Sequence, residues 1–277
     1  MRLEDTSESD LVIQSPQVVT EDSSVSWRSV AVPSEHGGWS LTAEPAILGL
    51  FVAWSLPGLA LGVAVMVAFM ARTPVKVVMV DRFRGRWLPR TRLAAKIAAG
   101  ELAVLAALAA YALTAPQPFW IPLAVAVPLI ALELWFDMRS RSRRLIPELA
   151  GSIGIGSIAT AIALAGGAST RLSWGLWLVV AARSVAAIPY VRTQILRTRS
   201  RPGPRWHSDA AQLAGVAAVL IGWVFDLVPA GAAVAIAVLA VINVVAVRLT
   251  PRPAVVIGIQ QTIFGVAVIL TTAIAVT

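Results

Sequence analysis

The chain has 277 residues, of which 57% are hydrophobic, and its mean hydropathy is +0.77. A soluble domain of this size cannot bury so much apolar sequence, so the composition predicts a polytopic helical membrane protein. The net charge of +8 does not predict a nucleic-acid partner, because most cations stand in short connectors between apolar runs, as in membrane-protein loops. With no cysteine and only two histidines, the chain is predicted to hold no disulfide, no metal and no cofactor.

The first 32 residues differ in kind from the rest. They combine several serines with many acids and contain no apolar run long enough for a signal peptide. We therefore predict a disordered acidic tail on the cytoplasmic side, with membrane insertion directed by internal spans. The acids are Glu4, Asp5, Glu8, Asp10, Glu21 and Asp22.

Residues 33–277 are predicted to form an all-α membrane domain with nine transmembrane helices. Each apolar run approaches the roughly 20 residues that cross a bilayer core. The predicted spans lie near 38–55, 59–80, 97–114, 119–136, 149–167, 174–191, 210–226, 230–247 and 254–276. The turns around Pro57 and Pro229 are tight enough for re-entrant hairpins, which leaves that alternative open for the two pairs of spans they join.

The connectors alternate in charge, which predicts the orientation in the membrane. Connectors 81–96, 137–148, 192–209 and 248–253 are rich in arginine, whereas the intervening connectors hold Arg171 as their single cation. Because basic loops stay in the cytoplasm, the N-terminus is predicted to be cytoplasmic and the C-terminus outside.

The segment "ARTPVK" places two cations and a proline inside the second predicted span. Arg72 lies ten residues before Arg82, which is about 15 Å deeper along a helix, where an isolated arginine costs roughly 3 kcal/mol. Lys76 follows one turn later, and Pro74 frees a backbone carbonyl that protein or water must satisfy.

The sixth span repeats this pattern in "ARSVAAIPYVR", where Arg183 precedes Pro189 and Arg192. We interpret the two segments as an internal pseudo-repeat that points cations from two equivalent helices into one cytoplasm-facing cavity. Further polar residues are expected on the same side of the membrane. The predicted ligand-binding residues are Arg72, Lys76, Arg183, Arg192, Glu35, His36, Glu44 and Asp81. An alternative is that Arg72 and Glu44 form a purely structural ion pair.

The opening "PSEHGGW" resembles the Pro-x-x-His-Gly-x-Trp start of the YwiC-like family of bacterial integral membrane proteins. The later segments "ARTPVKVVMVDRFRGR", "SRSRRLIPELAGS" and "ARSVAAIPYVRTQILR" are also similar to that family, so the resemblance runs from about residue 33 to the C-terminus. It implies a multi-pass protein of the bacterial cell membrane and brings no activity with it.

The predicted topology is more distantly similar to UbiA-type prenyltransferases, which implies a UbiA-like bundle and, if the protein is an enzyme, a related transferase. In those proteins aspartate-rich motifs on helices two and six hold Mg²⁺ against a diphosphate. This chain departs from the pattern, since span two ends with Asp81 alone and span six has no acid before Asp209. Mg²⁺ needs several carboxylate oxygens, whereas the arginines here suit direct binding of an anion.

Three functions follow from these patterns. The first is binding of an anionic ligand, an isoprenoid or a phospholipid, on a scaffold whose partners are membrane lipids. The second is transport of a small anion, which proline-broken helices near mid-membrane favour. The third is a structural or assembly subunit that docks through its acidic tail. No catalytic residue can be named from the sequence.

Overall fold

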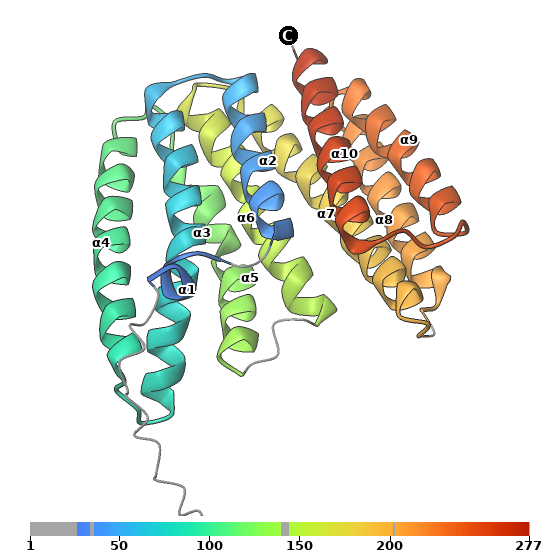
Figure 1. Cartoon of the computed structure of the whole chain (residues 1–277). Helices are drawn as coiled ribbons and strands as arrows, with labels where there is room; N and C mark the ends of the chain where they lie inside the picture. Colours follow the sequence, from blue (N-terminus) through green and yellow to red (C-terminus); the bar gives the residue numbers. More distant parts are fainter. Residues whose placement is uncertain (1–26, 34–35, 140–143, 202, 277) are drawn as a thin grey trace, which may run out of the picture.

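The computed structural model describes residues 27–33, 36–139, 144–201 and 203–276, and every regular element in these ranges is an α-helix (Figure 1). The predicted all-α class is confirmed. The helices are α1 (Trp27–Ala31), α2 (His36–Val52), α3 (Leu56–Phe83), α4 (Pro89–Ala112), α5 (Trp120–Met138), α6 (Leu145–Ala165), α7 (Thr170–Thr198), α8 (Arg205–Val224), α9 (Ala230–Ala246) and α10 (Ala254–Ile274).

Each of the nine predicted spans corresponds to one helix, α2 to α10. Local signals set several helix ends: Ser55 accepts a hydrogen bond from the Gly58 N–H at 2.9 Å, and Ser169 accepts one from the Leu172 N–H at 3.3 Å. Within the described ranges, α3, α4, α5, α6, α7 and α10 are long and apolar enough to cross a membrane. Helices α2 and α9 have 17 residues each and α8 begins with a polar turn, so the count of nine spans stays a prediction.

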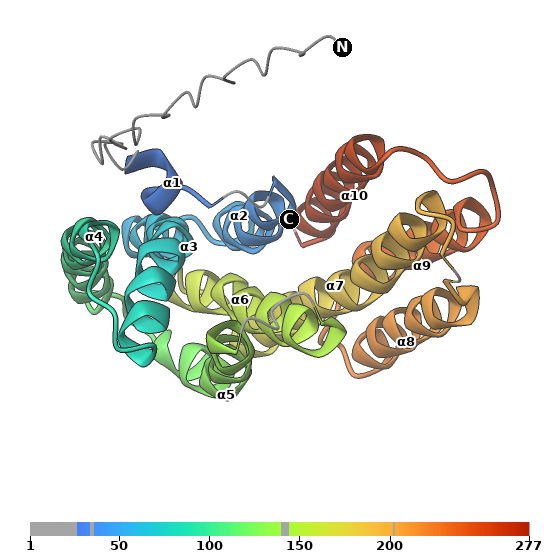
Figure 2. The same cartoon turned by 60° about the horizontal axis from the view of Figure 1, so that its bottom comes forward.

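Helices α6 and α7 form the centre of the bundle and are its most buried spans. Helix α6 packs against α2, α3 and α5 on one side and against α7 on the other, while α8, α9 and α10 surround α7 (Figure 2). Small residues allow this close packing in an apolar environment. A Cβ on Gly49 of α2, for example, would lie 2.9 Å from the Ala159 carbonyl oxygen of α6, so only glycine fits there.

The N-terminal segment contains a short helix that the sequence did not predict. Helix α1 packs against α3 and α4, with Val30 and Ala31 buried. Its position falls inside the predicted tail of residues 1–32, and the correction is that residues 27–31 of that tail are helical and packed on the bundle. Residues 1–26 lie outside the described ranges.

The arginine-rich connectors gather at one end of the bundle. Figure 1 shows the C-terminal ends of α3, α5, α7 and α9, with the start of the helix that follows each, toward the end opposite the C-terminus. This arrangement is expected because successive helices run antiparallel, so every second connector lies at the same end of the bundle.

Candidate functional site

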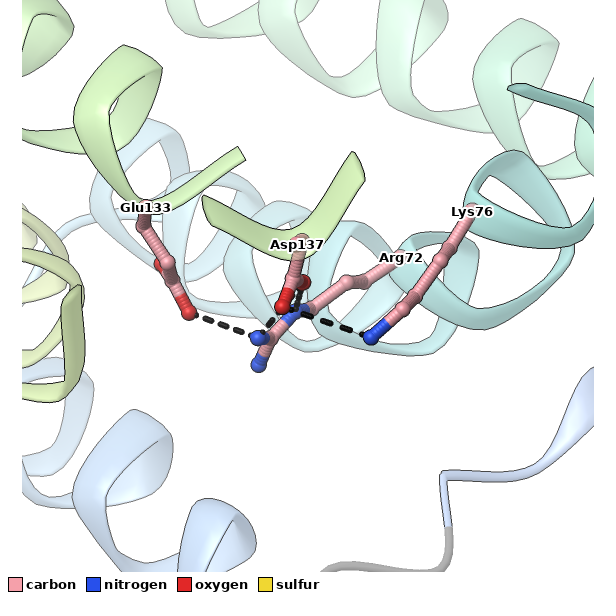
Figure 3. A network of polar contacts seen from close by, with 4 residues as sticks. All are labelled: Arg72, Lys76, Glu133 and Asp137. Atoms are coloured by element: carbon pink, nitrogen blue, oxygen red, sulfur yellow. Dashed lines mark hydrogen bonds and ion pairs between the residues drawn. The ribbon is translucent and has the colours of Figure 1, made fainter. Parts of the chain in front are cut away.

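Two cations of α3 face two acids of α5 inside the bundle. Arg72 and Lys76 are one turn apart on α3, and Glu133 and Asp137 are one turn apart on α5, so each pair lies on one helix face. We call these four residues the Arg72 cluster (Figure 3).

Arg72 makes the strongest contacts in the Arg72 cluster. It donates from Nε and Nη2 to Oδ2 of Asp137 at 3.1 and 2.8 Å, and its Nη2 is also 2.8 Å from Oε1 of Glu133. Lys76 reaches the other oxygen of Asp137 at 3.3 Å. Because a buried carboxylate is stable only with a charged or hydrogen-bonding partner, Asp137 depends on these two cations.

The four charges of the Arg72 cluster cancel, but their exposure differs. The side chain of Asp137 is 3% exposed, that of Arg72 is 24% exposed and that of Lys76 is 38% exposed. Lys76 therefore combines the longest contact with the greatest accessibility. Arg72 is held by two acids from the neighbouring helix and is the fixed member of the group.

The Arg72 cluster forms the polar part of a cavity of about 270 Å³. The rest of its wall is apolar and comes mainly from α3, α4 and α5, with Leu105 of α4 and Ile130 of α5 among the lining side chains. Helix α4 packs on α3 and α5 packs on α6, but α4 and α5 are not packed on each other in the described ranges. Leu102 of α4 and Leu134 of α5 both line the cavity and are exposed, so the cavity is accessible along the sides of these two helices.

A second charged group lies deeper in the bundle and involves different helices. We call Arg183 of α7, Glu44 of α2 and Gln261 of α10 the Arg183 cluster. The Arg183 side chain is 3% exposed, and its Nη2 donates to the backbone carbonyl of Gln261 at 2.6 Å and lies 3.9 Å from Oε1 of Glu44. Its Nε and Nη1 find no hydrogen-bond partner in the part of the chain that the structure describes.

The acceptors around Arg183 are also incompletely used. Oε1 of Glu44 and Oε1 of Gln261 are buried without a partner among the described residues. Each such group loses roughly 1–3 kcal/mol relative to a satisfied one. The Arg183 cluster therefore contains buried polar atoms without hydrogen-bond partners among the described residues, which is unfavourable for stability. In the Arg72 cluster, both cations contact an acid.

A row of amides continues the Arg183 cluster across the second half of the bundle. Nε2 of Gln261 donates to Asn243 of α9 at 3.4 Å, Nδ2 of Asn243 donates to Gln212 of α8 at 3.4 Å, and Gln212 donates to the Ala186 carbonyl of α7 at 2.7 Å. Hydrogen bonds between helices help to hold a membrane bundle together, because an apolar side chain contacts lipid as favourably as it contacts another helix.

The structure separates the two arginines that the sequence placed in one site. Arg72 lines the cavity with its own acids on α5, while Arg183 pairs with Glu44, and α6 lies between α3 and α7 (Figure 2). The prediction that they converge on a common cavity is wrong. The alternative pair of Arg72 with Glu44 is wrong too, because Glu44 points to α7 and α10 instead.

Two other predicted site residues have structural partners away from the cavity. Asp81 is buried and accepts from Arg90 at 3.2 and 2.9 Å and from the Thr91 hydroxyl at 2.6 Å, which fixes the turn between α3 and α4. Arg192 donates to Glu148 of α6 at 2.8 Å. These two side chains do not line the cavity of the Arg72 cluster.

The remaining predictions concern the start of the first span. His36 opens α2, and Glu35 lies outside the described residues. The sequence-based site omitted Glu133 and Asp137, the acids that complete the Arg72 cluster. The signal was present: two acids one turn apart in an apolar run match two cations one turn apart in another. In the described ranges, no group of three or more His, Asp or Glu side chains is placed to hold a metal ion.

These long apolar helices with charges paired between them define an α-helical integral membrane protein. Residues 32–163 match the model of the family described as YwiC-like protein, and over this region the predicted family is confirmed. The match contains α2 to α5, most of α6 and the whole Arg72 cluster. Arg183 lies beyond it. No curated protein and no solved structure matches the chain, so the similarity to UbiA-type proteins stays a prediction.

Proposed function

We propose that this protein binds an anionic amphiphile of the membrane in the cavity beside the Arg72 cluster, with Lys76 as the contact to its headgroup. We further propose nine membrane spans with the arginine-rich end in the cytoplasm. The observation that carries the proposed function is a cavity that has mostly apolar walls, contains the charged Arg72 cluster and is accessible along α4 and α5, two helices with exposed apolar side chains. Such a shape suits a ligand that is charged at one end and apolar along its length.

The choice of Lys76 over Arg72 follows from their partners. Asp137 keeps Arg72 on one oxygen when the ammonium of Lys76 turns to a ligand, so the buried carboxylate never loses its charge partner. Moving Arg72 would leave both Glu133 and Asp137 with less compensation. An anionic headgroup therefore replaces Asp137 as the partner of Lys76, at the more exposed edge of the Arg72 cluster, and leaves the contacts of Arg72 in place.

The apolar part of the ligand is proposed to lie against α4 and α5. Leu102, Leu105 and Leu134 form the wall next to the opening, and a chain that leaves the cavity there enters the surrounding lipid. An isoprenoid and a phospholipid both have the required chemistry. Extraction and identification of the bound lipid distinguish the two.

The test is native mass spectrometry of the purified full chain, with extraction of co-purifying lipids. Lys76→Gln is expected to weaken the bound anionic lipid about tenfold, the size of a charged hydrogen bond. Lys96→Gln is the matched control, because Lys96 is an exposed cation of α4 that does not line the cavity. Leu105→Trp, which fills the apolar wall, is expected to reduce binding without changing any charge. Equal binding by all four proteins would overturn the proposal.

The absence of native cysteine makes the orientation testable. Thr114 and Thr198 are exposed threonines at opposite ends of the helices, and each hydroxyl donates to the carbonyl three residues earlier. Single cysteines at these positions are expected to react differently in intact cells. Thr114→Cys should react with a membrane-impermeant maleimide and Thr198→Cys should react only after permeabilisation; the reverse result would invert the proposed topology.

A second candidate function, transport of a small anion, is favoured by the Arg183 cluster. A buried guanidinium with two unused nitrogens can bind an anion that passes through the bundle. The discriminating measurement is anion flux in proteoliposomes of wild type and Arg183→Lys. Flux that depends on Arg183 supports transport, and its absence leaves ligand binding as the better function.

A further inference from the structure

A second groove lies in the half of the bundle formed by α7 to α10. It has a volume of about 330 Å³ and is bounded by α7, α9, α10 and the connector between α9 and α10. This groove belongs to the arginine-rich end, because α9 ends and α10 begins there. It shares no residue with the cavity of the Arg72 cluster.

One side of the groove is apolar and faces outward. Val241, Val245 and Leu249 line it, and all three are exposed at the surface of the bundle. On a membrane-spanning helix, exposed aliphatic side chains of this kind contact the hydrocarbon chains of lipids. The wall therefore suits an acyl chain that runs alongside α9.

The other end of the groove is polar and carries one positive charge. Thr250, Arg252 and Gln260 line this end, and Arg252 is the one charged residue among the groove's lining side chains. Arg252 is exposed and has no ion-pair or hydrogen-bond partner in the described part of the chain. Pro251 and Pro253 flank it and restrict its backbone.

The neighbouring charges leave Arg252 uncompensated. Asp209 of α8 uses both oxygens on Arg248 at 3.0 and 2.9 Å, and the hydrogen bond to Asp209 raises the pKa of Arg248. Arg197 donates to the carbonyls of Val247 and Leu249 at the end of α9. Neither neighbouring group neutralises Arg252, and this is where the groove differs from the Arg72 cluster, in which every cation has an acid.

The inner side of the groove is held in place by buried hydrogen bonds. Gln194 donates to the Tyr190 hydroxyl at 3.2 Å and to the Ala246 carbonyl at 3.1 Å, and it accepts from Arg197 at 3.1 Å. Tyr190 and Gln194 are both buried. The groove is thus a formed feature of the packing of α7 against α9.

We propose that this groove binds an anionic phospholipid of the membrane leaflet on the arginine-rich side. Its phosphodiester accepts hydrogen bonds from Arg252, from the Thr250 hydroxyl and from the Gln260 amide, and one acyl chain lies on Val241 and Val245. A guanidinium is well suited to a phosphate group because two parallel N–H groups match two oxygens. This site is independent of the proposed function, since it uses different helices and a different cation.

The test is titration of the delipidated full chain in neutral detergent with phosphatidylglycerol and, separately, with phosphatidylcholine, followed by native mass spectrometry. The wild type is expected to prefer phosphatidylglycerol. Arg252→Gln should weaken phosphatidylglycerol binding about tenfold and bring it close to phosphatidylcholine, as expected for loss of a charge-assisted contact. Val245→Trp should weaken both lipids, because it fills the apolar wall.

Arg199→Gln is the matched control. Arg199 is an exposed arginine at the same end of the bundle and does not line the groove. A neutral detergent carries no surface potential, so this variant should change phosphatidylglycerol binding less than twofold if the site is specific. Equal loss in Arg199→Gln and Arg252→Gln would show general attraction to a basic surface and overturn the proposal.

Two further results separate this groove from its alternatives. Glycerol phosphate should not compete at concentrations where phosphatidylglycerol does, because it lacks the acyl chain; effective competition would show a soluble phosphate site instead. Lys76→Gln, which acts on the other proposed lipid site, should leave in place the phosphatidylglycerol whose binding depends on Arg252. Loss of binding in Lys76→Gln but not in Arg252→Gln would assign the lipid to the other cavity and overturn this inference while sustaining the proposed function.

Discussion

The Arg72 and Arg183 clusters each place an arginine inside a long apolar helix, but in different surroundings. Arg72 has two acids at 2.8 Å and borders a cavity. Arg183 is almost fully buried, has one acid at 3.9 Å and keeps two nitrogens without partners among the described residues. Paired and partly exposed charges can exchange partners with a ligand, whereas a buried pair mainly fixes how helices pack.

Glu133 of the Arg72 cluster and Glu44 of the Arg183 cluster also differ in the free space around their side chains. The carboxylate of Glu133 lies against Gly151 of α6, and that of Glu44 lies against Gly265 of α10; a Cβ on either glycine would overlap with the acid. Glu133 borders the cavity and has space to move, while Glu44 is enclosed by α2, α7 and α10.

The largest effect is expected for Arg183→Ala. Removing the cation leaves Glu44 buried beside Gln261, and breaking a buried pair in this way costs about 3–5 kcal/mol. The measurement is the apparent Tm of the purified full chain in detergent. Arg183→Met combined with Glu44→Met should recover most of the loss, because apolar side chains of similar volume often replace a buried pair without penalty. A double variant as unstable as Arg183→Ala would contradict the pairing.

The second effect concerns the glycines. Gly265→Ala is expected to lower stability by about 1–3 kcal/mol, because Glu44 has no free space into which it can move. Gly151→Ala should cost less than about 1 kcal/mol, since Glu133 can shift into the cavity. The control is Gly258→Ala, where nothing lies within 4 Å of the added Cβ and helix propensity alone predicts a gain of up to about 1 kcal/mol. Thermal unfolding of the three variants under one condition gives the order; similar losses at Gly151 and Gly265 would remove the contrast.

Arg72→Gln is expected to have an intermediate effect of about 1–2 kcal/mol. The variant loses both ion pairs, but Lys76 remains beside Asp137 and the region is partly exposed. The same thermal measurement, run beside Arg183→Ala, tests the comparison directly. If Arg72→Gln is the more damaging of the two, the Arg72 cluster is a structural centre and not an exchangeable site.

The smallest effect on stability is expected for Lys76→Gln, below about 1 kcal/mol, because Lys76 is 38% exposed, its contact is long and the buried Asp137 keeps Arg72 as a partner. The same variant is expected to lose the bound anionic lipid. Stability and lipid content should therefore be measured on one preparation. A large drop in Tm in lipid-free protein would show that Lys76 supports the fold, and the interpretation of its binding defect would change.

The sequence predicted the helices well because the signals are local. Apolar runs placed α2 to α10, and caps such as Ser55 and Ser169 refined their ends. The candidate site was predicted only in part. Arg72 and Lys76 were identified as unusual, but the likeness of "ARTPVK" and "ARSVAAIPYVR" led to a shared cavity that the packing does not form.

The reason lies in what each level of structure decides. Hydropathy and proline positions can be read from single segments, and the alternation of arginine can be read from successive connectors along the chain. These features by themselves determined that the chain is a helical membrane protein with energetically costly charges inside two of its helices. Which acid meets which cation depends on the rotation of each helix and on its neighbours. Arg72 and Asp137 are 65 positions apart in the sequence, and only the packed bundle brings them together, places Glu44 beside Arg183 and leaves Lys76 at the edge of the cavity.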